Sequence, residues 1–418
     1  MQKIAIVIPS LFGGGAEKAA VTISNGLNNH YEVYIIALEI GKSYDLEKNV
    51  VYIKLTNLHC KAGKSIKLLY FPYQLFKLKM ILNEINPDVV ISFMERTSFM
   101  LHLIRGNKNI YSFHNYMSFH LYKEHVPFPL KFLRNFVYKS FLKNMHKSAK
   151  YCVTMSKEAM IDLKKNFQVK SDIDVIYYPF DIKKIINLSS ENSKYDELFN
   201  NFDVLINVGR LEKQKGQWYL LRIFKELIKN NNVKLVILGE GSLKSYLVNL
   251  AEQLGLKVYV DNKRNIFGFD YDIYFLGFQQ NPFKFMKRSK LFVFTSLWEG
   301  FPNILVEALA CSKTIITTDC HSGPRELLEP GSNPLLKTKI ASFAKYGILM
   351  PNFPITFMQY ENPLLECEKI WVKTINYLLE NKNILEDYEG KALERAYDFN
   401  VNKIIDKWHK LIYKVNNE

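Results

Sequence analysis

The 418-residue sequence is short of acidic residues, has no paired cysteine motif and lacks long apolar runs. Its 41 Asp and Glu stand against 56 Lys and Arg, so the net charge is +15. The five Cys are scattered without CxxC spacing, which favours neither a disulfide framework nor a zinc site and fits a reducing cytosol. The apolar run Ile4 to Ile8 is too short for a signal peptide or a membrane-spanning helix. We expect a globular protein that is soluble or attached to a membrane surface.

The positive charge is concentrated in the N-terminal segment up to Phe180, which carries a net +11 against +4 for the remainder. Lys61 to Leu82 contains five Lys and no acid, and the interval between Glu124 and Glu158 contains seven basic residues and no acid. Apolar residues recur at helical spacing in both stretches, which predicts basic amphipathic helices. Such helices suit an anionic membrane surface, and the alternative is an ordinary core-facing helix with a basic solvent side. The seven basic residues are Lys131, Arg134, Lys139, Lys143, Lys147, Lys150 and Lys157.

Nucleic acid is the other common partner of a basic chain. The sequence has no nucleic-acid-binding motif and no basic tail, and aromatic residues such as Phe71 and Phe136 fall at the spacing of a buried helix face. We therefore expect no nucleic-acid partner.

Short β-branched segments alternate with longer helical patterns, which is typical of parallel sheets covered by helices. The alternation restarts near residue 200 and predicts two doubly wound α/β halves, residues 1–182 and 183–395, with residues 396–418 as a helix that crosses back to the first half. The whole segment from Leu385 to Val415 is expected to be helical. Ligands of such sheets bind in the loops after the strands, so we expect a cleft between two facing halves. The expected strands are Ile4–Ile8, Val33–Ile36, Val89–Ile91, Ile110–Phe113, Val204–Val208, Val233–Leu238, Ile273–Leu276, Leu291–Phe294 and Thr314–Thr317.

Two of these loops have residues suited to phosphate. After the first strand, Gly13 to Lys18 forms a glycine-rich turn that opens a helix, where free amides attract anions. The turn is not GxGxxG, so a dinucleotide site is poorly supported, and a plain tight turn is the alternative. In the second half, Gly209 and Gly216 bracket the cations Arg210 and Lys215, which suit a diphosphate unless they are ordinary surface charges.

The segment Ser296 to Ala308 combines a flexible loop, a helix start and two acids. Pro302 suits the first helical turn, and the amides from Gly300 to Asn303 are expected to form an anion site. Glu299 precedes the helix and Glu307 lies one turn within it, so the two carboxylates are expected to take a sugar and a ribose diol at different ends of one ligand. A structural helix with a capping acid is the alternative.

These motifs resemble the retaining GT-B glycosyltransferases of family 4, and the resemblance covers nearly the whole chain. It implies two Rossmann-like doubly wound domains facing a central cleft, with sugar transfer from a nucleotide diphosphate sugar, retention at the anomeric carbon and no metal or other cofactor. Two DxD strings, Asp172–Asp174 and Asp270–Asp272, do not follow a strand, and we interpret both as chance. The motifs, in family order, are Gly13–Lys18, Val175–Asp181, Gly209–Gly216, Gly239–Gly241, Phe275–Phe278 and Glu299–Glu307.

The resemblance also implies roles for individual residues. Arg210 and Lys215 would hold the diphosphate and stabilise its leaving charge, Glu299 would contact the donor sugar, and His114 would lie near that sugar unless it is a core or surface histidine. Tyr178 departs from the family, which commonly has Asn before the interdomain Pro, so the hinge is not carried over. The full expected donor-binding set is Gly14, Gly15, Gly209, Arg210, Lys215, Gly241, Phe278, Glu299, Gly300, Phe301, Pro302, Asn303 and Glu307.

Ser322–Leu328 and Tyr346–Pro351 resemble the subgroup that builds bacterial surface glycans on polyprenyl diphosphate. We therefore expect transfer of a hexose or N-acetylhexosamine, with UDP as the expected nucleotide, to a lipid-linked or other glycan acceptor. The enzyme is expected to lie on the cytoplasmic face of an anionic inner membrane as a peripheral protein. A GT-B nucleotide-sugar epimerase and a non-catalytic sugar-nucleotide-binding protein are the alternatives.

Overall fold

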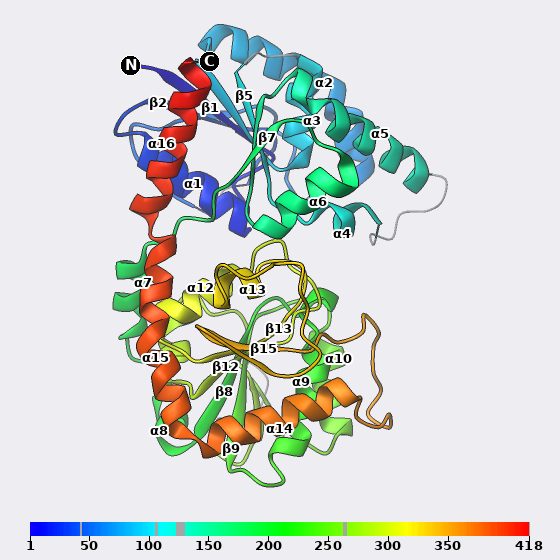
Figure 1. Cartoon of the computed structure of the whole chain (residues 1–418), viewed down its shortest axis with the longest axis vertical. Helices are drawn as coiled ribbons and strands as arrows, with labels where there is room; N and C mark the ends of the chain where they lie inside the picture. The colour runs from blue at the N-terminus through cyan, green and yellow to red at the C-terminus, as the bar shows by residue number, and fades with distance from the viewer. Residues whose placement is uncertain (42–43, 105–107, 123–129, 262–265, 418) are drawn as a thin grey trace. The chain divides into compact units, whose positions relative to one another are not determined.

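The computed structural model of the chain consists of two units. The structure describes all residues except 42–43, 105–107, 123–129, 262–265 and 418, and the side chains of Lys64 and residues 120–134 are also outside the description. The first unit comprises Met1–Phe180 and Phe399–Glu418, and the second comprises Asp181–Asp398. Figure 1 shows each unit as a sheet covered by helices. The units divide at 180/181 and 398/399, whereas the sequence places these divisions at 182/183 and 395/396.

The first unit is built on a parallel seven-stranded sheet with the order β3-β2-β1-β4-β5-β6-β7. Lys3 pairs with Glu32 on one side of β1, and Ile4 pairs with Val89 on the other, so the strand order reverses between β1 and β4. Apolar runs such as Ile4 to Ile8 form these strands because both faces are covered. The strands are β1 (Lys3–Ile8), β2 (Glu32–Ala37), β3 (Val51–Lys54), β4 (Val89–Phe93), β5 (Asn109–Phe113), β6 (Tyr151–Thr154) and β7 (Asp172–Val175).

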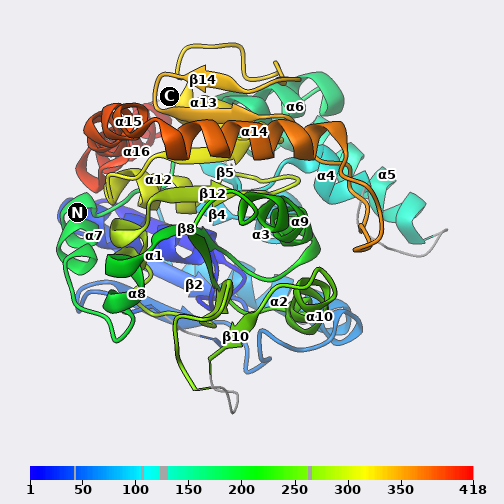
Figure 2. The same ribbon diagram turned by 90° about the horizontal axis from the view of Figure 1, so that it is seen from below.

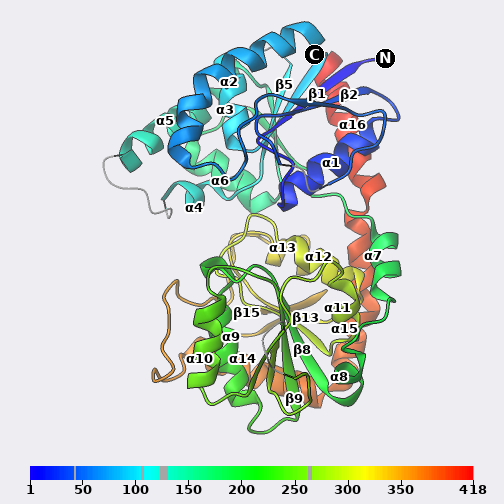
Figure 3. The same cartoon turned by 180° about the vertical axis from the view of Figure 1, so that it is seen from behind.

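Helices cover both faces of this sheet. Right-handed crossovers place α2, α3, α5 and α6 on one face and α1 on the other, where α1 packs against α16 (Figures 1 and 3). The ring of Phe99 contacts Phe71 and Phe141 and so joins α2, α3 and α5 into one layer. The helices are α1 (Gly15–Leu27), α2 (Lys64–Ile85), α3 (Glu95–Ile104), α4 (Met117–Tyr122), α5 (Leu130–Asn144), η1 (Met145–Lys147), α6 (Lys157–Phe167) and α16 (Val401–Asn417).

The second unit has an eight-stranded sheet with the order β10-β11-β9-β8-β12-β13-β15-β14, in which β14 runs antiparallel to β15. The strands are β8 (Asp203–Val208), β9 (Val233–Leu238), β10 (Val258–Val260), β11 (Ile273–Phe275), β12 (Leu291–Phe294), β13 (Ile315–Thr318), β14 (Ser342–Ala344) and β15 (Gly347–Met350). The helices are α7 (Ile182–Ser189), α8 (Asp196–Asn201), η2 (Lys213–Lys215), α9 (Gln217–Leu227), α10 (Lys244–Gln253), α11 (Phe283–Arg288), α12 (Asn303–Ala310), α13 (Pro324–Leu328), α14 (Glu366–Glu380) and α15 (Lys382–Ala396).

Helix α14 packs beside α9 in the second unit, as Figure 2 shows. A buried ion pair joins them, with Arg222 Nε 2.7 Å from Glu368 Oε1. The fully buried Trp371 donates from its indole to the Pro351 carbonyl. These contacts fix α9 and α14 on the sheet. They thereby stabilise the strands whose ends lead into the functional loops.

The prediction of one helix from Leu385 to Val415 is wrong. Helix α15 ends at Ala396, a 3-10 turn η3 (Tyr397–Phe399) follows, and α16 begins at Val401. The amide of Phe180 donates to the Phe399 carbonyl, and the amide of Val401 donates to the Phe180 carbonyl, both at 2.9 Å. These hydrogen bonds to Phe180 take the place of helical hydrogen bonds. The helix is therefore interrupted between α15 and α16, where the chain returns to the first unit.

The expectation of an amphipathic helix is wrong for α2, which has apolar side chains on both its packed and its exposed side. Phe136 on α5 is exposed, although its spacing predicted burial, whereas Phe141 and Leu142 on the same helix are buried. Lys131 and Arg134, which belong to the predicted basic helix, lie outside the described side chains, as does Lys64. Within the described residues no helix has the length and apolar character needed to cross a membrane.

Candidate functional site

The loops after the parallel strands of the second unit lie at one edge of its sheet, because the carboxyl ends of parallel strands share an edge. Backbone hydrogen bonds tie these loops together. Leu211 donates to the Glu240 carbonyl at 2.9 Å, Leu297 donates to the Gln214 carbonyl at 2.8 Å, and Glu299 donates to the His321 carbonyl. Segments that are far apart in sequence therefore form one surface.

Lys215 and Glu299 form an ion pair at this edge, with Nζ 2.6 Å from Oε1. The two side chains are only 14% and 7% exposed, so each charge depends on the other for compensation. The Gln214 side-chain amide donates to Glu299 Oε2 at 3.2 Å and to the Trp298 carbonyl at 2.8 Å. Lys215 Nζ also lies 4.8 Å from the centre of the Phe294 ring. The sequence singled out Lys215 and Glu299 separately, but it did not predict their pairing or the part of Gln214.

Glycines allow the loops to approach each other. Gly216 has a φ of +60°, and a Cβ there would lie 2.5 Å from the Thr295 carbonyl oxygen. A Cβ on Gly241 would lie 2.4 Å from the Leu211 carbonyl oxygen. A side chain at either position would push the loop away from the Lys215–Glu299 pair. Gly241 is predicted to contact the donor. Its close approach to Leu211 also requires a residue without a side chain.

Arg210 and Phe278 have exposed side chains at the same edge. The Arg210 carbonyl accepts a hydrogen bond from the Gln217 side chain at 3.1 Å, which fixes the backbone beneath the guanidinium. Glu212 accepts from the amide and hydroxyl of Ser242, and the backbone hydrogen bond lowers the pKa of this carboxyl. Gly209 lies against the Lys215 stem, because a Cβ there would be 3.4 Å from Lys215 Cε.

Helix α12 begins at Asn303, so Pro302 occupies the N-cap rather than the first helical turn predicted for it. The Asn303 amide donates to the Phe301 carbonyl at 3.0 Å, so the prediction of a free amide is wrong at this residue. Gly300 accepts a hydrogen bond from the Ser322 hydroxyl at 2.5 Å. Glu307 lies one turn into α12 and is partly exposed, which separates it from the paired Glu299 as the sequence predicts.

Three buried polar atoms at this edge have no hydrogen-bond partner among the residues that the structure describes: Gln217 Oε1, Ser296 Oγ and Asn303 Oδ1. Buried polar groups are normally hydrogen-bonded, so each of these atoms is available to a polar group of a ligand. All three belong to segments that flank Lys215 or Glu299. The site therefore has unused hydrogen-bonding capacity beside a charged pair.

In the first unit, α1 begins at Gly15 after a Gly14 N-cap that has no side-chain cap. The Glu17 carboxylate folds back over Gly14, since a Cβ there would lie 2.0 Å from Glu17 Oε2. Burial raises the pKa of Glu17. Glu17 therefore lies where the sequence predicts a phosphate, and phosphate binding by the amides at this helix start stays a prediction.

His114, which follows β5, is buried between two aromatic rings. Its ring centre lies 4.9 Å from that of Phe93 and 5.6 Å from that of Tyr178, and both contacts are stacked. Nδ1 is 2.7 Å from the Tyr178 hydroxyl oxygen, and Nε2 is 3.0 Å from the Ser112 hydroxyl oxygen. Burial lowers the pKa of His114 to about 3, so the ring is neutral near pH 7. Tyr178, noted in the sequence only as a departure, is a direct partner of His114.

The two DxD strings do not follow strand ends. Asp172 and Asp174 lie within β7, and Asp270 and Asp272 precede β11. In the part of the chain that the structure describes, no three His, Cys, Asp or Glu side chains cluster as a metal site would require.

Two family models match the chain, one in each half. Glycosyltransferase Family 4 matches residues 13–184, and Glycosyl transferases group 1 matches residues 189–346. The chain is 34% identical over 364 residues to an uncharacterized glycosyltransferase of Methanocaldococcus jannaschii, covering 84% of this chain and 86% of the relative.

A second relative spans almost the whole chain. It is the N-acetylgalactosamine-N,N'-diacetylbacillosaminyl-diphospho-undecaprenol 4-alpha-N-acetylgalactosaminyltransferase of Campylobacter jejuni, 28% identical over 410 residues and covering 97% of both chains. Among solved structures, Anabaena HepE in complex with UDP has a TM-score of 0.71 at 18% identity, covering 99% of this chain and 100% of the other. At this identity the structural likeness concerns the fold alone.

Proposed function

Because the chain belongs to glycosyltransferase family 4 and has the GT-B fold, we propose that it transfers a hexose or N-acetylhexosamine from a nucleotide diphosphate sugar, with UDP as the nucleotide. The proposed acceptor is a glycan carried on polyprenyl diphosphate. Support for this acceptor comes from the relative that matches 97% of both chains, whose name specifies a diphospho-undecaprenol acceptor. In the reaction, the bond from the sugar C1 to the donor phosphate breaks and a bond from C1 to the acceptor oxygen forms. The acceptor proton passes to the departing diphosphate.

The observation that carries the proposal is the Lys215–Glu299 ion pair. A nearly buried cation beside the diphosphate would stabilise the negative charge that develops on it as it leaves. A nearly buried carboxylate accepts hydrogen bonds from sugar hydroxyls. When a donor binds, Lys215 would move to the diphosphate and Glu299 would take hydroxyl hydrogens, so each remains compensated. Arg210, exposed at the same edge, would supply a second cation.

The other donor contacts follow from the same edge. Asn303 Oδ1, buried and without a partner among the described residues, would accept from a ligand hydroxyl. Glu307 would take the ribose diol. In the first unit, the amides of Gly14 and Gly15 would bind phosphate after Glu17 swings away, and the neutral His114 would orient the donor sugar. Lysine and arginine charges would serve in place of a metal ion, so chelation by EDTA is expected to leave transfer unchanged.

A panel of nucleotide sugars, incubated with bacterial membrane lipid extract and followed by mass spectrometry, tests the proposal. One donor is expected to add the mass of one sugar to a polyprenyl-diphosphate glycan. Glu299→Ala is expected to abolish the shift, and Glu366→Ala, an exposed acid on α14, is expected to preserve it. Full transfer by Glu299→Ala would refute the assignment of the site.

The same assay separates the alternative functions. Epimerised sugar formed from donor without acceptor would identify an isomerase instead of a transferase. Donor binding without turnover across the panel would identify a non-catalytic sugar-nucleotide-binding protein.

The proposed place of action is the cytoplasmic face of the membrane, with the enzyme attached peripherally. The polyprenyl chain of the acceptor remains in the bilayer, whereas a nucleotide sugar is water-soluble. The enzyme must therefore bring a dissolved donor to a membrane-anchored acceptor. The net +11 charge of the segment from Met1 to Phe180 supports attachment through the first unit.

A further inference from the structure

Helix α2 has an apolar face that is largely open to solvent among the residues that the structure describes. Its inner face packs on the sheet through the buried side chains Leu78, Leu82 and Ile85. Six exposed apolar side chains lie on the opposite side, and at about 100° per residue they fall within an arc of about 120°. We call these six the outer stripe: Ile66, Leu69, Tyr70, Tyr73, Phe76 and Met80.

The outer stripe is strongly exposed, with Leu69 79% and Phe76 64% accessible to solvent. Scattered exposed apolar residues are normal, but a contiguous patch marks an interaction surface. The inner face already secures α2 to the sheet, so the fold does not require the outer stripe. The outer stripe of α2 is therefore a surface that is available to a binding partner.

The charge around the outer stripe fits an anionic partner. No acidic residue occurs from Lys61 to Leu82. Lys61 and Lys79 are exposed, and Lys77 Nζ lies 5.9 Å from the centre of the Tyr73 ring. Lys67 is different because its Nζ pairs with Glu39 at 2.8 Å within the first unit. An exposed apolar stripe with lysines nearby and no acidic residue is suited to an anionic membrane interface.

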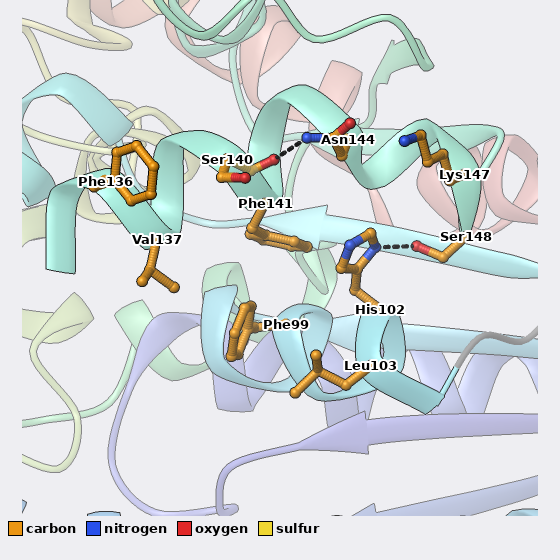
Figure 4. Close-up of a pocket in the computed structure, with 10 residues that line it drawn as sticks. All are labelled: Phe99, His102, Leu103, Phe136, Val137, Ser140, Phe141, Asn144, Lys147 and Ser148. Atoms are coloured by element: carbon orange, nitrogen blue, oxygen red, sulfur yellow. Dashed lines mark hydrogen bonds between the residues drawn. The ribbon is translucent and has the colours of Figure 1, made fainter. Parts of the chain in front are cut away.

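Two neighbouring helices of the same layer have exposed apolar side chains of their own. A cavity of about 560 Å³ opens between α3 and α5. Figure 4 shows Phe136 and Val137 projecting from α5 on one side and Phe99 and Leu103 from α3 on the other. Leu103, Phe136 and Val137 are exposed. A second exposed apolar patch therefore lies on α3 and α5, in the region of the chain that has a basic excess.

We propose that the outer stripe of α2 inserts into the headgroup region of an anionic bilayer, with Lys61 and Lys79 on lipid phosphates. This proposal rests on the proposed function in one respect: a polyprenyl-linked acceptor requires the enzyme to reach the membrane. Insertion of apolar side chains adds a contribution that salt does not screen. High salt is therefore expected to weaken binding only in part, whereas lysine contacts alone would be lost.

Vesicle flotation of the full chain tests the proposal. The protein is expected to float with vesicles of phosphatidylcholine and phosphatidylglycerol, in part even at high salt, and much less with phosphatidylcholine alone. Leu69→Glu combined with Phe76→Glu is expected to reduce vesicle binding about tenfold or more, given the free energy of burying two large apolar side chains. Leu69→Ser combined with Phe76→Ser is the milder pair should the charged pair fold poorly.

The matched control is Tyr413→Glu, because Tyr413 is 72% exposed on α16, which lies on the other face of the same sheet. It is expected to float as the wild type does. Absence of flotation with anionic vesicles, equal flotation with neutral vesicles, or full flotation of both double variants would overturn the proposal. A dimer in solution that Leu69→Glu dissociates would also overturn it, since a second copy would then cover the stripe.

Glu299→Ala separates this proposal from the proposed function. The variant is expected to float as the wild type does while failing to transfer sugar. A wild-type chain that transfers sugar but does not float would refute the bilayer contact alone.

Discussion

The carboxyl edges of the two sheets are both built from loops that follow parallel strands, but the groups proposed to act at them differ. The second unit brings a cation and a carboxylate together, with Lys215 and Glu299 at 2.6 Å. The first unit places a neutral histidine between Phe93 and Tyr178, and its one acid at the α1 start folds onto its own helix. Parallel strands bring loops together in both units, but the loop residues decide which groups each edge contains.

In the proposed reaction, a charged pair and a neutral ring are expected to contribute in different ways. A charged pair responds to charge that develops in a transition state, so its removal affects the chemical step directly. A neutral ring held by stacking and hydrogen bonds acts through position, so its disturbance has a smaller effect. The predictions below test this contrast in order of expected size.

Lys215→Ala is expected to have the largest effect. It removes the cation proposed for the leaving diphosphate and leaves the nearly buried Glu299 without its ion-pair partner. We expect kcat/KM for sugar transfer to fall by about 10²- to 10³-fold. Lys213→Ala is the control, because Lys213 lies in the same η2 turn and its Nζ sits near the Phe357 ring. Equal losses in both variants would show that the turn matters only as structure.

Acid is expected to destabilise the first unit through His114. Burial lowers its pKa to about 3 from 6.5, so below pH 6.5 the unfolded chain binds a proton that the folded chain excludes. Stability from this group is present above pH 6.5 and is lost as the pH falls towards 3, by about 2 kcal/mol at pH 5. Urea unfolding at pH 7 and pH 5 measures the loss. His114→Gln is expected to remove this part of the pH dependence, and an unchanged pH dependence would contradict the assignment.

Tyr178→Phe is expected to have a moderate effect on transfer. The substitution retains a ring for stacking but removes the hydroxyl that lies 2.7 Å from His114 Nδ1. One hydrogen bond contributes about 0.5–1.5 kcal/mol, so kcat is expected to fall about two- to tenfold with little change in KM. Tyr31→Phe, which changes a partly exposed tyrosine elsewhere in the first unit, is the control. A change in KM alone would place Tyr178 in donor binding instead of in positioning His114.

Glu17→Gln is expected to have the smallest effect. Burial raises the pKa of Glu17, so its contribution to stability is fully present below its unfolded pKa and is lost as the pH rises through the folded value. Glutamine removes this dependence and also the charge that competes with a phosphate at the α1 start. Interactions of one charge with a helix end are worth about 0.3–1 kcal/mol. Thermal unfolding at pH 4 and pH 8 is expected to differ less for the variant than for the wild type.

Much of the fold could be predicted because its signals are local. Runs such as Ile4 to Ile8 become buried parallel strands, and the family assignment from the motifs is confirmed by the matches in both halves. The individual site residues stay predictions, although the structure places Gly209, Arg210, Lys215 and Glu299 at one edge. The break between α15 and α16 could not be predicted. It depends on backbone hydrogen bonds between Phe180 and the distant residues Phe399 and Val401.

Local sequence patterns are enough to specify the two doubly wound sheets, the basic excess of the segment up to Phe180 and the residue types that follow the strands. These features follow from apolar periodicity, composition and loop chemistry, which act over short stretches of chain. Three features depend on tertiary contacts: Lys215 pairs with Glu299, Tyr178 contacts His114, and α2 exposes a second apolar face. Each of these depends on which distant segments come into contact, and a one-dimensional pattern does not specify those contacts.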